Sequence, residues 1–482
     1  MVAFIQNSES KGKRIDFWLI AFWLFLVIAG WLNIYSAVYT EEHSSIFDFS
    51  QRYGMQFLWI TASLIVGLLI IYVINPSTYS VLSPGLYIVM LALLLAVSFL
   101  GKEVHGSKSW FDLGAFAFQP AEFSKITTSL LLAYTMSIYG FSLKKPSDAI
   151  KSALIVFVPI LLIIMEKETG SALVYMGFIL VFYMEGLAGW VIILGLSIIA
   201  LFVITLKFSP LVAVICTASA ATLIRSFIRR EFMQTAIMLP IIVLLCFLPS
   251  LSETKFFSFL NNLNLEIWAL IILSPILILW IKSLLFSKSK GEKYLFFSVL
   301  CAVLMIFSVN YIFDNVLQPH QRGRIEEQLG ITNDPHGLGY NVHQSKIAIG
   351  SGGFTGKGFL NGTQTKYNFV PEQSTDFIFC TVGEEWGFLG SIAIIVVYLS
   401  LIIRIILLAS KNKDGFSKIY GYCIASIFTM HVLINLGMTM GLVPVIGIPL
   451  PLLSYGGSSM ISFTILLFIF IRLDMERQNN KG

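Results

Sequence analysis

The sequence is poor in charged residues, and this shortage excludes most classes of soluble protein. Charged side chains make up 12% of the 482 residues, against ~25% in an ordinary soluble domain. Hydrophobic residues make up 56%, and the mean hydropathy is +0.82. A soluble chain of this length could not bury so much apolar surface. The composition therefore excludes a water-soluble enzyme, a disordered protein and a nucleic-acid-binding protein.

The sequence also lacks cysteine motifs and alternating strands. The five cysteines show no CxxC or metal-ligand spacing, and they lie in or beside apolar runs where we expect them to pack as small side chains. Outer-membrane β-barrels alternate apolar and polar residues, whereas runs such as 239–247 are continuously apolar. The sequence thus predicts an all-α polytopic membrane protein.

Apolar runs of roughly 20 residues, the length that a membrane helix needs, predict about fourteen spans. Their expected bounds are 15–38, 56–74, 84–101, 121–141, 150–165, 170–186, 188–207, 209–226, 232–250, 267–286, 294–314, 384–409, 416–437 and 455–473. Helices one to eleven therefore fall in 15–314 and helices twelve to fourteen in 384–473. The remaining ends, 1–14 and 474–482, are expected to be terminal tails.

Lysine and arginine gather at alternate ends of the expected helices. One set of ends carries basic clusters, at residues 11–14, 144–151, 225–230, 282–293, 411–418 and 472–481. The other ends are mainly acidic, at residues 41–42, 166–168 and 253–266. Basic loops stay on the cytoplasmic side of a membrane. The pattern therefore predicts that both termini are cytoplasmic.

The longest polar stretch, residues 315–383, is expected to form one large extracytoplasmic loop. Loops longer than ~15 residues are usually functional or disordered. Apolar anchors such as Ile347 and Phe377 indicate an ordered loop. We therefore expect this loop to carry the function of the protein.

Residues 350–358 of this loop read Gly-Ser-Gly-Gly-Phe-Thr-Gly-Lys-Gly. They do not form a nucleotide-binding P-loop, which needs glycine where Ser351 stands and Ser or Thr where Gly358 stands. Two interpretations stay open. The glycines permit tight turns, or backbone N–H groups bind an anionic ligand beside Lys357.

Carboxylates are concentrated in and after the loop. Asp334 precedes Pro335, which is a common opening of a turn. Four more lie where the chain re-enters the membrane: Glu372, Asp376, Glu384 and Glu385. Either they favour the dipole at a helix N-terminus, or they are paired or near water, because an isolated carboxylate in a membrane is costly.

Several motifs together resemble the SEDS family (shape, elongation, division and sporulation), whose members are bacterial peptidoglycan polymerases. The matching segments are 110–114, 118–122 with Lys125, 334–341, 344–353, 356–358, 362–364, 371–372, 375–379, 384–385 and 435–458. Gly-Lys-Gly at 356–358 and Gly-Thr-Gln at 362–364 resemble the RodA branch more than the FtsW branch. The resemblance covers most of the chain.

The sequence departs from the family pattern in three places. The family usually has about ten helices, so about four spans within 188–314 are expected to be inserted. Many members have Gln-Pro-Asp-Leu-Gly-Thr where residues 166–171 read Glu-Lys-Glu-Thr-Gly-Ser. Where an arginine often precedes Phe-Gln-Pro, this chain has Ala117, so the role of that arginine is absent or supplied elsewhere.

The resemblance implies a peptidoglycan glycosyltransferase that polymerises lipid II during cell elongation and shape maintenance. Lipid II would be both donor and acceptor, and undecaprenyl pyrophosphate would leave. This chemistry needs a base near the attacking hydroxyl. It also needs positive charge or a metal near the departing pyrophosphate.

The family match assigns the catalytic role to Asp334. It would act as general base or as ligand to a divalent cation, Mg²⁺ or Mn²⁺, and both alternatives stay open. Glu122 and Lys125 lie three residues apart on one helix face, either in the central cavity or as a structural ion pair. The full set of expected substrate-binding residues is Glu122, Lys125, Gln344, Ser345, Lys357, Arg322, Arg324 and Glu385.

Two rival functions are a lipid II flippase and a non-catalytic scaffold of the cell-wall elongation complex. Coupled transporters usually place ionisable groups in mid-membrane. Here the clear intramembrane charge is Arg404, which lies near the cytoplasmic end and can extend to the interface. Because polar residues concentrate in the loop, the sequence favours chemistry at the outer surface.

The resemblance also implies partners and location. The expected protein partners are a class B penicillin-binding protein, which is a transpeptidase, and other membrane proteins of the elongation complex. The other expected partners are lipid II and the membrane, with no nucleic acid. The expected location is the bacterial inner membrane, as a multi-pass protein.

Overall fold

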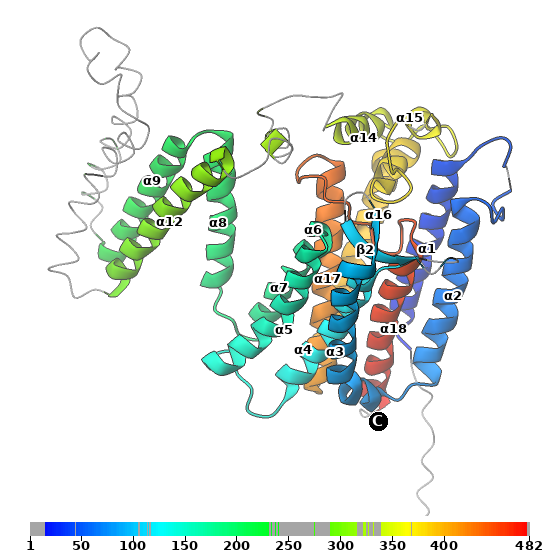
Figure 1. Cartoon of the computed structure of the whole chain (residues 1–482), viewed down its shortest axis with the longest axis horizontal. Coiled ribbons are helices and arrows are strands. Elements are labelled where there is room, and N and C mark those ends of the chain that lie inside the picture. The colour runs from blue at the N-terminus through cyan, green and yellow to red at the C-terminus, as the bar shows by residue number, and fades with distance from the viewer. Residues whose placement is uncertain are drawn as a thin grey trace, which may run out of the picture. The chain divides into compact units, whose positions relative to one another are not determined.

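The fold is known from a computed structural model and is almost entirely helical (Figure 1). The structure describes residues 15–43, 45–104, 107–112, 114, 117–230, 290–315, 322–323, 326, 331, 339–367 and 369–479, with four single positions at 233, 237, 240 and 274. The described chain divides into two compact units, residues 1–188 with 340–482 and residues 189–339. Each unit is considered by itself.

Unit 1 contains the helices on both sides of the expected insertion. They are α1 (Phe17–Val38), α2 (Arg52–Tyr72), α3 (Pro76–Leu100), α4 (Pro120–Ser137), α5 (Pro146–Met165), α6 (Thr169–Tyr175), α7 (Phe178–Met184), α14 (Tyr340–Ser351), α15 (Thr363–Lys366), α16 (Ile378–Ser410), α17 (Gly415–Thr439) and α18 (Gly457–Asn479). Unit 2 contains α8 (Trp190–Lys207), α9 (Pro210–Arg229) and α12 (Lys290–Asn315).

Ten of the described helices are long and apolar enough to cross a membrane. The prediction of an all-α polytopic membrane protein is therefore confirmed. The expected spans at 232–250 and 267–286 lie outside the described residues. One expected span, 170–186, is divided into α6 and α7, which are separated at Met176 and Gly177.

Local sequence explains where several helices begin. Proline stands at the first position of α3, α4, α5 and α9, where its missing N–H would have no partner in any case. At α1, Asp16 accepts a hydrogen bond from the backbone N–H of Leu19 at 3.3 Å. At α17, Asp414 accepts one from the N–H of Ser417 at 2.9 Å. Side chains of this kind satisfy N–H groups that have no partner within the helix.

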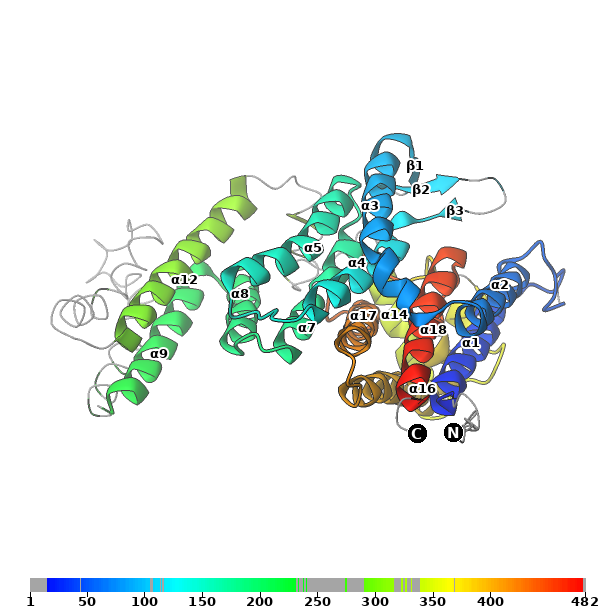
Figure 2. The same ribbon diagram turned by 90° about the horizontal axis from the view of Figure 1, so that it is seen from below.

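Helices α17 and α18 form the interior of unit 1. In their most apolar windows 83% and 89% of the residues are buried, against 22% in α3. Helix α18 packs against α2 and α4, and α17 packs against α4 and α16. Viewed from below, α18 lies between the α1–α2 pair and α17 (Figure 2). Most side chains on these two helices are therefore shielded from lipid by their neighbours.

A small sheet is added to the expected all-α fold. It consists of β1 (Lys102–Val104), β2 (Ser107–Asp112) and β3 (Ala117–Phe118), in the antiparallel order β1-β2-β3. Lys102 pairs with Trp110 between β1 and β2, and Phe111 pairs with Phe118 between β2 and β3. The sheet connects α3 to α4 along the chain, and its last residue, Phe118, directly precedes Gln119.

Unit 2 is a bundle of helices from the expected insertion. Small and branched residues of α9, among them Ala213 and Ala218, form a core with Val299 and Ile306 of α12. Helix α8 packs against both α9 and α12. Three of the five spans expected between residues 188 and 314 are thus described as helices.

The described residues of the expected loop that belong to unit 1, among them α14 and α15, lie at one end of that unit. Figure 1 shows α14 and α15 at this end and the end of α18 at the other. Arg404, near the end of α16, pairs with Asp16 at the start of α1. Near the start of α16, Glu385 accepts a hydrogen bond from Ser36 of α1. The basic residues Lys411 and Lys413, which follow α16, therefore lie at the end opposite to α14 and α15.

The glycine-rich segment 350–358 folds directly onto the backbone of α16. The N–H groups of Lys357 and Gly358 donate to the carbonyl oxygens of Glu384 and Glu385, both at 3.0 Å. A Cβ on Gly356 would lie 2.1 Å from the Glu385 oxygen. The close approach that these glycines permit is therefore to α16.

Helix α16 is kinked at Gly387, whose φ of 64° and ψ of −157° are not helical. This backbone region is essentially restricted to glycine. A Cβ on Gly387 would lie 2.2 Å from the backbone nitrogen of Gly356. The kink and the glycine-rich segment therefore depend on each other.

We predict that Gly387→Ala lowers the free energy of unfolding by about 2–4 kcal/mol, because alanine is strained at this φ and overlaps Gly356. The measurement is thermal unfolding of the purified protein in detergent. Gly350→Ala is the matched control, since Gly350 is exposed in α14 and has open space around it. That change should be neutral or stabilise by up to about 1 kcal/mol. Equal stability of the two variants would contradict the prediction.

Candidate active site

The carboxylate of Glu384 is the centre of the outer polar structure. It is fully buried and accepts hydrogen bonds from Lys357 Nζ at 2.7 Å, the N–H of Gln364 at 2.9 Å, and the N–H and hydroxyl of Thr365 at 2.8 and 2.6 Å. Thr363 adds a weaker hydroxyl contact at 3.2 Å. We call these five residues the outer clamp.

The outer clamp decides between the two explanations offered for the carboxylates at the membrane re-entry. Helix α16 begins at Ile378 and has no acidic residue in its first turn. Glu384 therefore lies too far along the helix for its N-terminal dipole to matter. The pairing explanation is confirmed for Glu384, and the dipole explanation is wrong for this residue.

The clamp also defines what Lys357 contacts. Its ammonium pairs with Glu384 and donates to the Thr363 hydroxyl at 2.7 Å, and 26% of its side chain is exposed. The residue was expected to bind substrate, beside an anionic ligand. In this structure its charge is compensated by Glu384, so it holds the loop to α16.

Two expected substrate-binding residues lie on α14, and a third follows Glu384. Ser345 is fully buried and donates to the carbonyl of Thr439 on α17 at 2.9 Å. Gln344 is half-buried beside it. Glu385 is buried and accepts the hydroxyl of Ser36. Of these three side chains only Gln344 is open to a ligand from solvent.

The segment 371–376 connects the clamp to the rest of the bundle. Gln373 Nε2 donates to the carbonyls of Ala37 at 2.5 Å and Thr365 at 2.9 Å. Asn435 Nδ2 on α17 donates to the carbonyls of Asp376 at 2.8 Å and Ile448 at 2.7 Å. Buried amide groups of this kind fix backbone segments that have no regular secondary structure.

Arg52 lies at the start of α2 beside the same segment, and the sequence analysis missed it. Its guanidinium donates to Ser374 Oγ at 2.7 Å and lies 3.7 Å from Glu372. It also lies 5.8 Å from the ring centroid of Tyr455. Nearly half of this side chain is exposed, so it adds positive charge at the end of unit 1 that carries α14.

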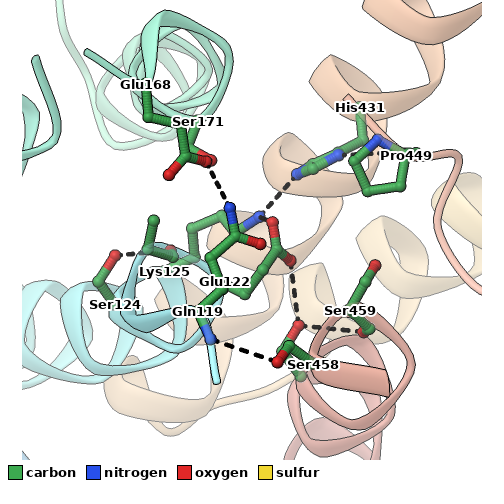
Figure 3. Close-up of polar contacts among 12 residues, drawn as sticks. Gln119, Glu122, Ser124, Lys125, Glu168, Ser171, His431, Pro449, Ser458 and Ser459 are labelled. Carbon is green, nitrogen blue, oxygen red and sulfur yellow. Dashed lines mark hydrogen bonds and ion pairs between the residues drawn. The ribbon is translucent and has the colours of Figure 1, made fainter. Parts of the chain in front are cut away.

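Glu122, Lys125, Glu168 and His431 form a second polar group inside unit 1, the buried charge cluster (Figure 3). Lys125 Nζ lies 2.8 Å from Glu122 Oε1 and 2.9 Å from His431 Nε2. The side chain of Lys125 is 0% exposed. The second Glu122 oxygen accepts from Ser462 of α18 at 3.2 Å. The ion pair that the spacing predicted is thus formed, and α17 and α18 enclose it.

Glu168 joins the cluster from the turn between α5 and α6. Its carboxylate accepts from Gln119 Nε2 at 2.7 Å and from the Ser171 hydroxyl. Burial raises the pKa of Glu168, and its hydrogen bonds with Ser171 and Gln119 partly oppose this. The residues that depart from the family pattern at 166–171 therefore connect to α4 (Figure 3).

The cluster corrects one sequence-based argument. Arg404 was taken as the one clear intramembrane charge, but it pairs with Asp16 at the end of its helix. Among the described residues, the ionisable side chains enclosed by helices include Glu122, Lys125 and His431. The sequence analysis missed His431. A lone histidine within the apolar span 416–437 was the signal that could have indicated it, because ionisable residues in membrane spans are usually functional.

Glu166 lies beside Glu168 and is 1% exposed. Within the described part of the chain neither of its carboxylate oxygens has a hydrogen-bond partner. Burial, with a smaller contribution from the negative charge of Glu168, raises the pKa of Glu166 to about 9. Glu166 is therefore neutral at physiological pH.

The remaining expected site residues belong to unit 2 or fall outside the description. Arg322 pairs with Asp314 and with Glu326, both at 3.0 Å. Its charge is therefore compensated within its own unit. Asp334 and Arg324 lie outside the described residues, so their positions are not defined here.

Comparison with known proteins identifies relatives along almost the whole chain. The profile of the FtsW/RodA/SpoVE family, described as cell cycle proteins, matches residues 17–231 and 269–479. The peptidoglycan glycosyltransferase RodA of Treponema pallidum is 30% identical over 447 residues, which is 92% of this chain and 94% of that protein. The peptidoglycan glycosyltransferase MrdB of Escherichia coli K12 is 30% identical over 401 residues, covering 82% and 79%.

Solved structures share the fold at lower identity. A chain of a peptidoglycan synthase complex that coordinates polymerization and crosslinking has a TM-score of 0.61 and 22% identity, covering 96% of this chain and 98% of that chain. The rod shape determining protein RodA of Thermus thermophilus has a TM-score of 0.54 and 19% identity, covering 96% and 97%. The arrangement of helices is therefore one already seen in experiment.

We predict that Glu384→Gln lowers the free energy of unfolding by about 2–4 kcal/mol, because an amide cannot accept from all of the clamp donors and leaves Lys357 unpaired. Thermal unfolding and limited proteolysis within 351–370 measure the effect. Glu372→Gln is the control, since 43% of that side chain is exposed and exposed pairs contribute at most about 1 kcal/mol. A clamp variant as stable and as protease-resistant as the control would refute this role.

We predict that stability depends on pH through Glu166. Its pKa is about 9 in the folded protein and its ordinary value is 4.5. The folded protein therefore keeps a proton that the unfolded chain loses in this interval. The contribution of Glu166 to stability is complete below pH 4.5, and it is lost as the pH rises to about 9.

Glu166→Met should remove this part of the pH dependence and raise the free energy of unfolding at pH 8 by about 2 kcal/mol, because a buried carboxyl group without partners is replaced by an apolar side chain. Unfolding temperatures between pH 5 and 9 measure it. Glu103→Met, at an exposed carboxylate in β1, is the control. Parallel pH curves for wild type and Glu166→Met would show that the carboxyl group is ionised in the folded state.

Proposed function

Because the chain belongs to the FtsW/RodA/SpoVE family, we propose that it is a peptidoglycan glycosyltransferase that polymerises lipid II during cell elongation and shape maintenance. The observation that carries this proposal is the match to relatives named peptidoglycan glycosyltransferase over 92% of the chain. The Gly-Lys-Gly and Gly-Thr-Gln motifs support the elongation branch. Both motifs belong to the segment that the outer clamp fixes against α16.

In the proposed reaction a sugar hydroxyl of one lipid II molecule attacks the anomeric carbon of another. A glycosidic C–O bond forms, the C–O bond to the pyrophosphate breaks, and undecaprenyl pyrophosphate leaves. The hydroxyl proton passes to a base. We propose Asp334 as this base or as a cation ligand, on the strength of the motif 334–341 alone.

A divalent cation, Mg²⁺ or Mn²⁺, was expected from the family. Among the residues that the structure describes, no group of three or more His, Cys, Asp or Glu side chains is arranged to hold a metal ion. Asp334, the carboxylate that the family match assigns to the cation, lies outside the described residues, so the cation stays a proposal and no step is assigned to it.

Positive charge near the pyrophosphate favours its departure, and Lys125 is the cation that we assign to this task. All three are paired with a carboxylate, Lys125 with Glu122, Lys357 with Glu384 and Arg322 with Glu326. Lys125 is the only one of these three whose side chain is fully buried, and a charge acts more strongly there than in water. Lys125 and Glu122 are enclosed by α17 and α18, so lipid II meets them only when one of these helices moves away from α4. The other proposed substrate-binding residues are Glu122, Gln344, Ser345, Lys357, Arg322, Arg324 and Glu385.

The proposed membrane orientation follows from charge. The end of unit 1 that carries Lys411 and Lys413 would be cytoplasmic, together with the tails 1–14 and 474–482. The loop 315–383 would then lie outside the inner membrane, where lipid II presents its sugars. Helices one to eleven would occupy 15–314 and helices twelve to fourteen 384–473.

A class B penicillin-binding protein is the proposed partner, together with other membrane proteins of the elongation complex. The support is a similar fold in a complex that coordinates polymerization and crosslinking. A polymerase makes the strands that a transpeptidase crosslinks. The two reactions are therefore efficient when the enzymes are held together.

Lipid II transport is the second candidate function, because the buried charge cluster lies among membrane helices. Enclosed ionisable residues of this kind often belong to transport pathways. The flippase and the polymerase differ in where they need chemistry. A flippase would use the cluster, whereas a polymerase also needs Asp334, and a scaffold needs neither.

We predict that Asp334→Asn reduces polymerisation by at least about 100-fold, as expected for loss of a general base. Purified protein, with and without the transpeptidase partner, is incubated with labelled lipid II and a divalent cation, and glycan strands are resolved on gels. Asp314→Asn is the control, because it neutralises a carboxylate on α12 that the family match does not include. Full-speed polymerisation by Asp334→Asn would refute the assignment, and lipid movement across liposomes without strand formation would support the flippase.

A further inference from the structure

The ammonium group of Lys125 has three donors, and the structure accounts for all of them. One contacts Glu122 Oε1 at 2.8 Å and one contacts His431 Nε2 at 2.9 Å. The third side of the ammonium faces the ring of Phe463 on α18, 5.1 Å from its centroid. His431 is thus the one neutral hydrogen-bond acceptor that the described residues offer to this cation.

The contacts of His431 define its tautomer. A charged lysine can only donate, so Nε2 of His431 must accept and carries no proton. The proton is then on Nδ1, which donates to the carbonyl of Pro449 at 3.3 Å. His431 is 1% exposed, and its ring packs edge-on against Phe463 with centroids 4.8 Å apart. The imidazole is therefore held in one orientation (Figure 3).

Pro449 connects this imidazole to the outer part of unit 1. The preceding residue, Ile448, is held by Asn435, which also holds the carbonyl of Asp376. Asn435 and His431 lie one turn apart on α17. The same helix thus fixes the segment 371–376, the segment 448–449 and the ammonium of Lys125.

We propose that His431 is a positioning residue that holds the charged ammonium of Lys125 in place for lipid II polymerisation. The inference rests on the proposed function. Without His431, one N–H of an enclosed ammonium would lack a partner, and the charged form would be destabilised. Lys125 would then rotate away from this position, and pyrophosphate departure would lose its nearby cation.

The test compares two replacements of His431. In His431→Gln the amide oxygen can accept from Lys125 while its N–H donates to Pro449. In His431→Leu the volume is similar but neither contact is possible. We expect His431→Leu to lower kcat about 10- to 100-fold, the effect of one hydrogen bond to a charged group. The KM for lipid II should change less than about threefold, and His431→Gln should keep kcat within about threefold of wild type.

A double-mutant cycle tests the contact without relying on activity. Unfolding temperatures are measured for His431→Leu, Lys125→Met and the double variant. If the two side chains act on each other, the two losses do not add. Leu433→Ala, on the lipid-facing side of α17 where 60% of the side chain is exposed, is the control for general damage to the helix.

The outcomes separate the two proposals. If wild type makes no strands, the proposed function fails, while the stability cycle still reports the contact. If wild type polymerises and His431→Leu matches it, the positioning role is wrong. It is also wrong if His431→Gln is as slow as His431→Leu, or if the two stability losses add. Loss of kcat in the leucine variant alone, with non-additive stabilities, supports it.

Discussion

The ordered structure around the outer loop depends on one buried carboxylate, Glu384. A carboxylate among membrane helices is costly unless it is hydrogen-bonded and paired. Lys357, Thr363, Gln364 and Thr365 supply those donors from a single stretch of nine residues, 357–365. The chain must therefore fold back onto α16 for Glu384 to be tolerated. The glycines of 350–358 matter because they let the two backbones come close enough for this.

The charges of the buried charge cluster are also enclosed by helices, so they too must be paired or hydrogen-bonded. Lys125 and Glu122 neutralise each other. His431 accepts a further hydrogen bond from Lys125, and Ser462 donates one to the second oxygen of Glu122. Replacing such a pair by apolar residues often stabilises a protein. An enclosed ion pair therefore makes better sense as part of a working site than as a source of stability. Glu166 is a contrasting case. Its carboxylate oxygens have no hydrogen-bond partner among the described residues, and burial keeps the group protonated and neutral.

Much of the fold could be predicted because apolar runs report directly on membrane helices. The span expected at 188–207 is α8, Trp190–Lys207. The start of α3 was placed near residue 84 because Ser77, Thr78 and Ser80 interrupt the apolar run, although Pro76 marked the true beginning. The strands β1 to β3 are too short for periodicity to reveal. The composition of the expected span 170–186 likewise does not indicate that it is divided into α6 and α7.

The site was harder to predict because its contacts join distant residues. Glu122 with Lys125 followed from spacing on one helix face. The contact between Lys125 and His431 spans 306 positions, and no local pattern indicates it. The pairing of Lys357 with Glu384 was equally invisible, so a loop lysine was taken as a ligand contact. Sequence shows which residues are chemically unusual, whereas packing decides which of them meet.

The position of α18 in the chain has a consequence for biogenesis. It follows all the other described helices in the chain, yet it is one of the most enclosed. It contacts α1 and α2, as between Trp23 and Thr464 across 441 positions. Contacts of such long range form late. During translation α4 enters the bilayer before α18 is made. Glu122 and Lys125 then lack their contacts with Ser462 and Phe463. A nascent chain that stalls before α18 would expose unshielded charge to lipid, and quality-control proteases could recognise it.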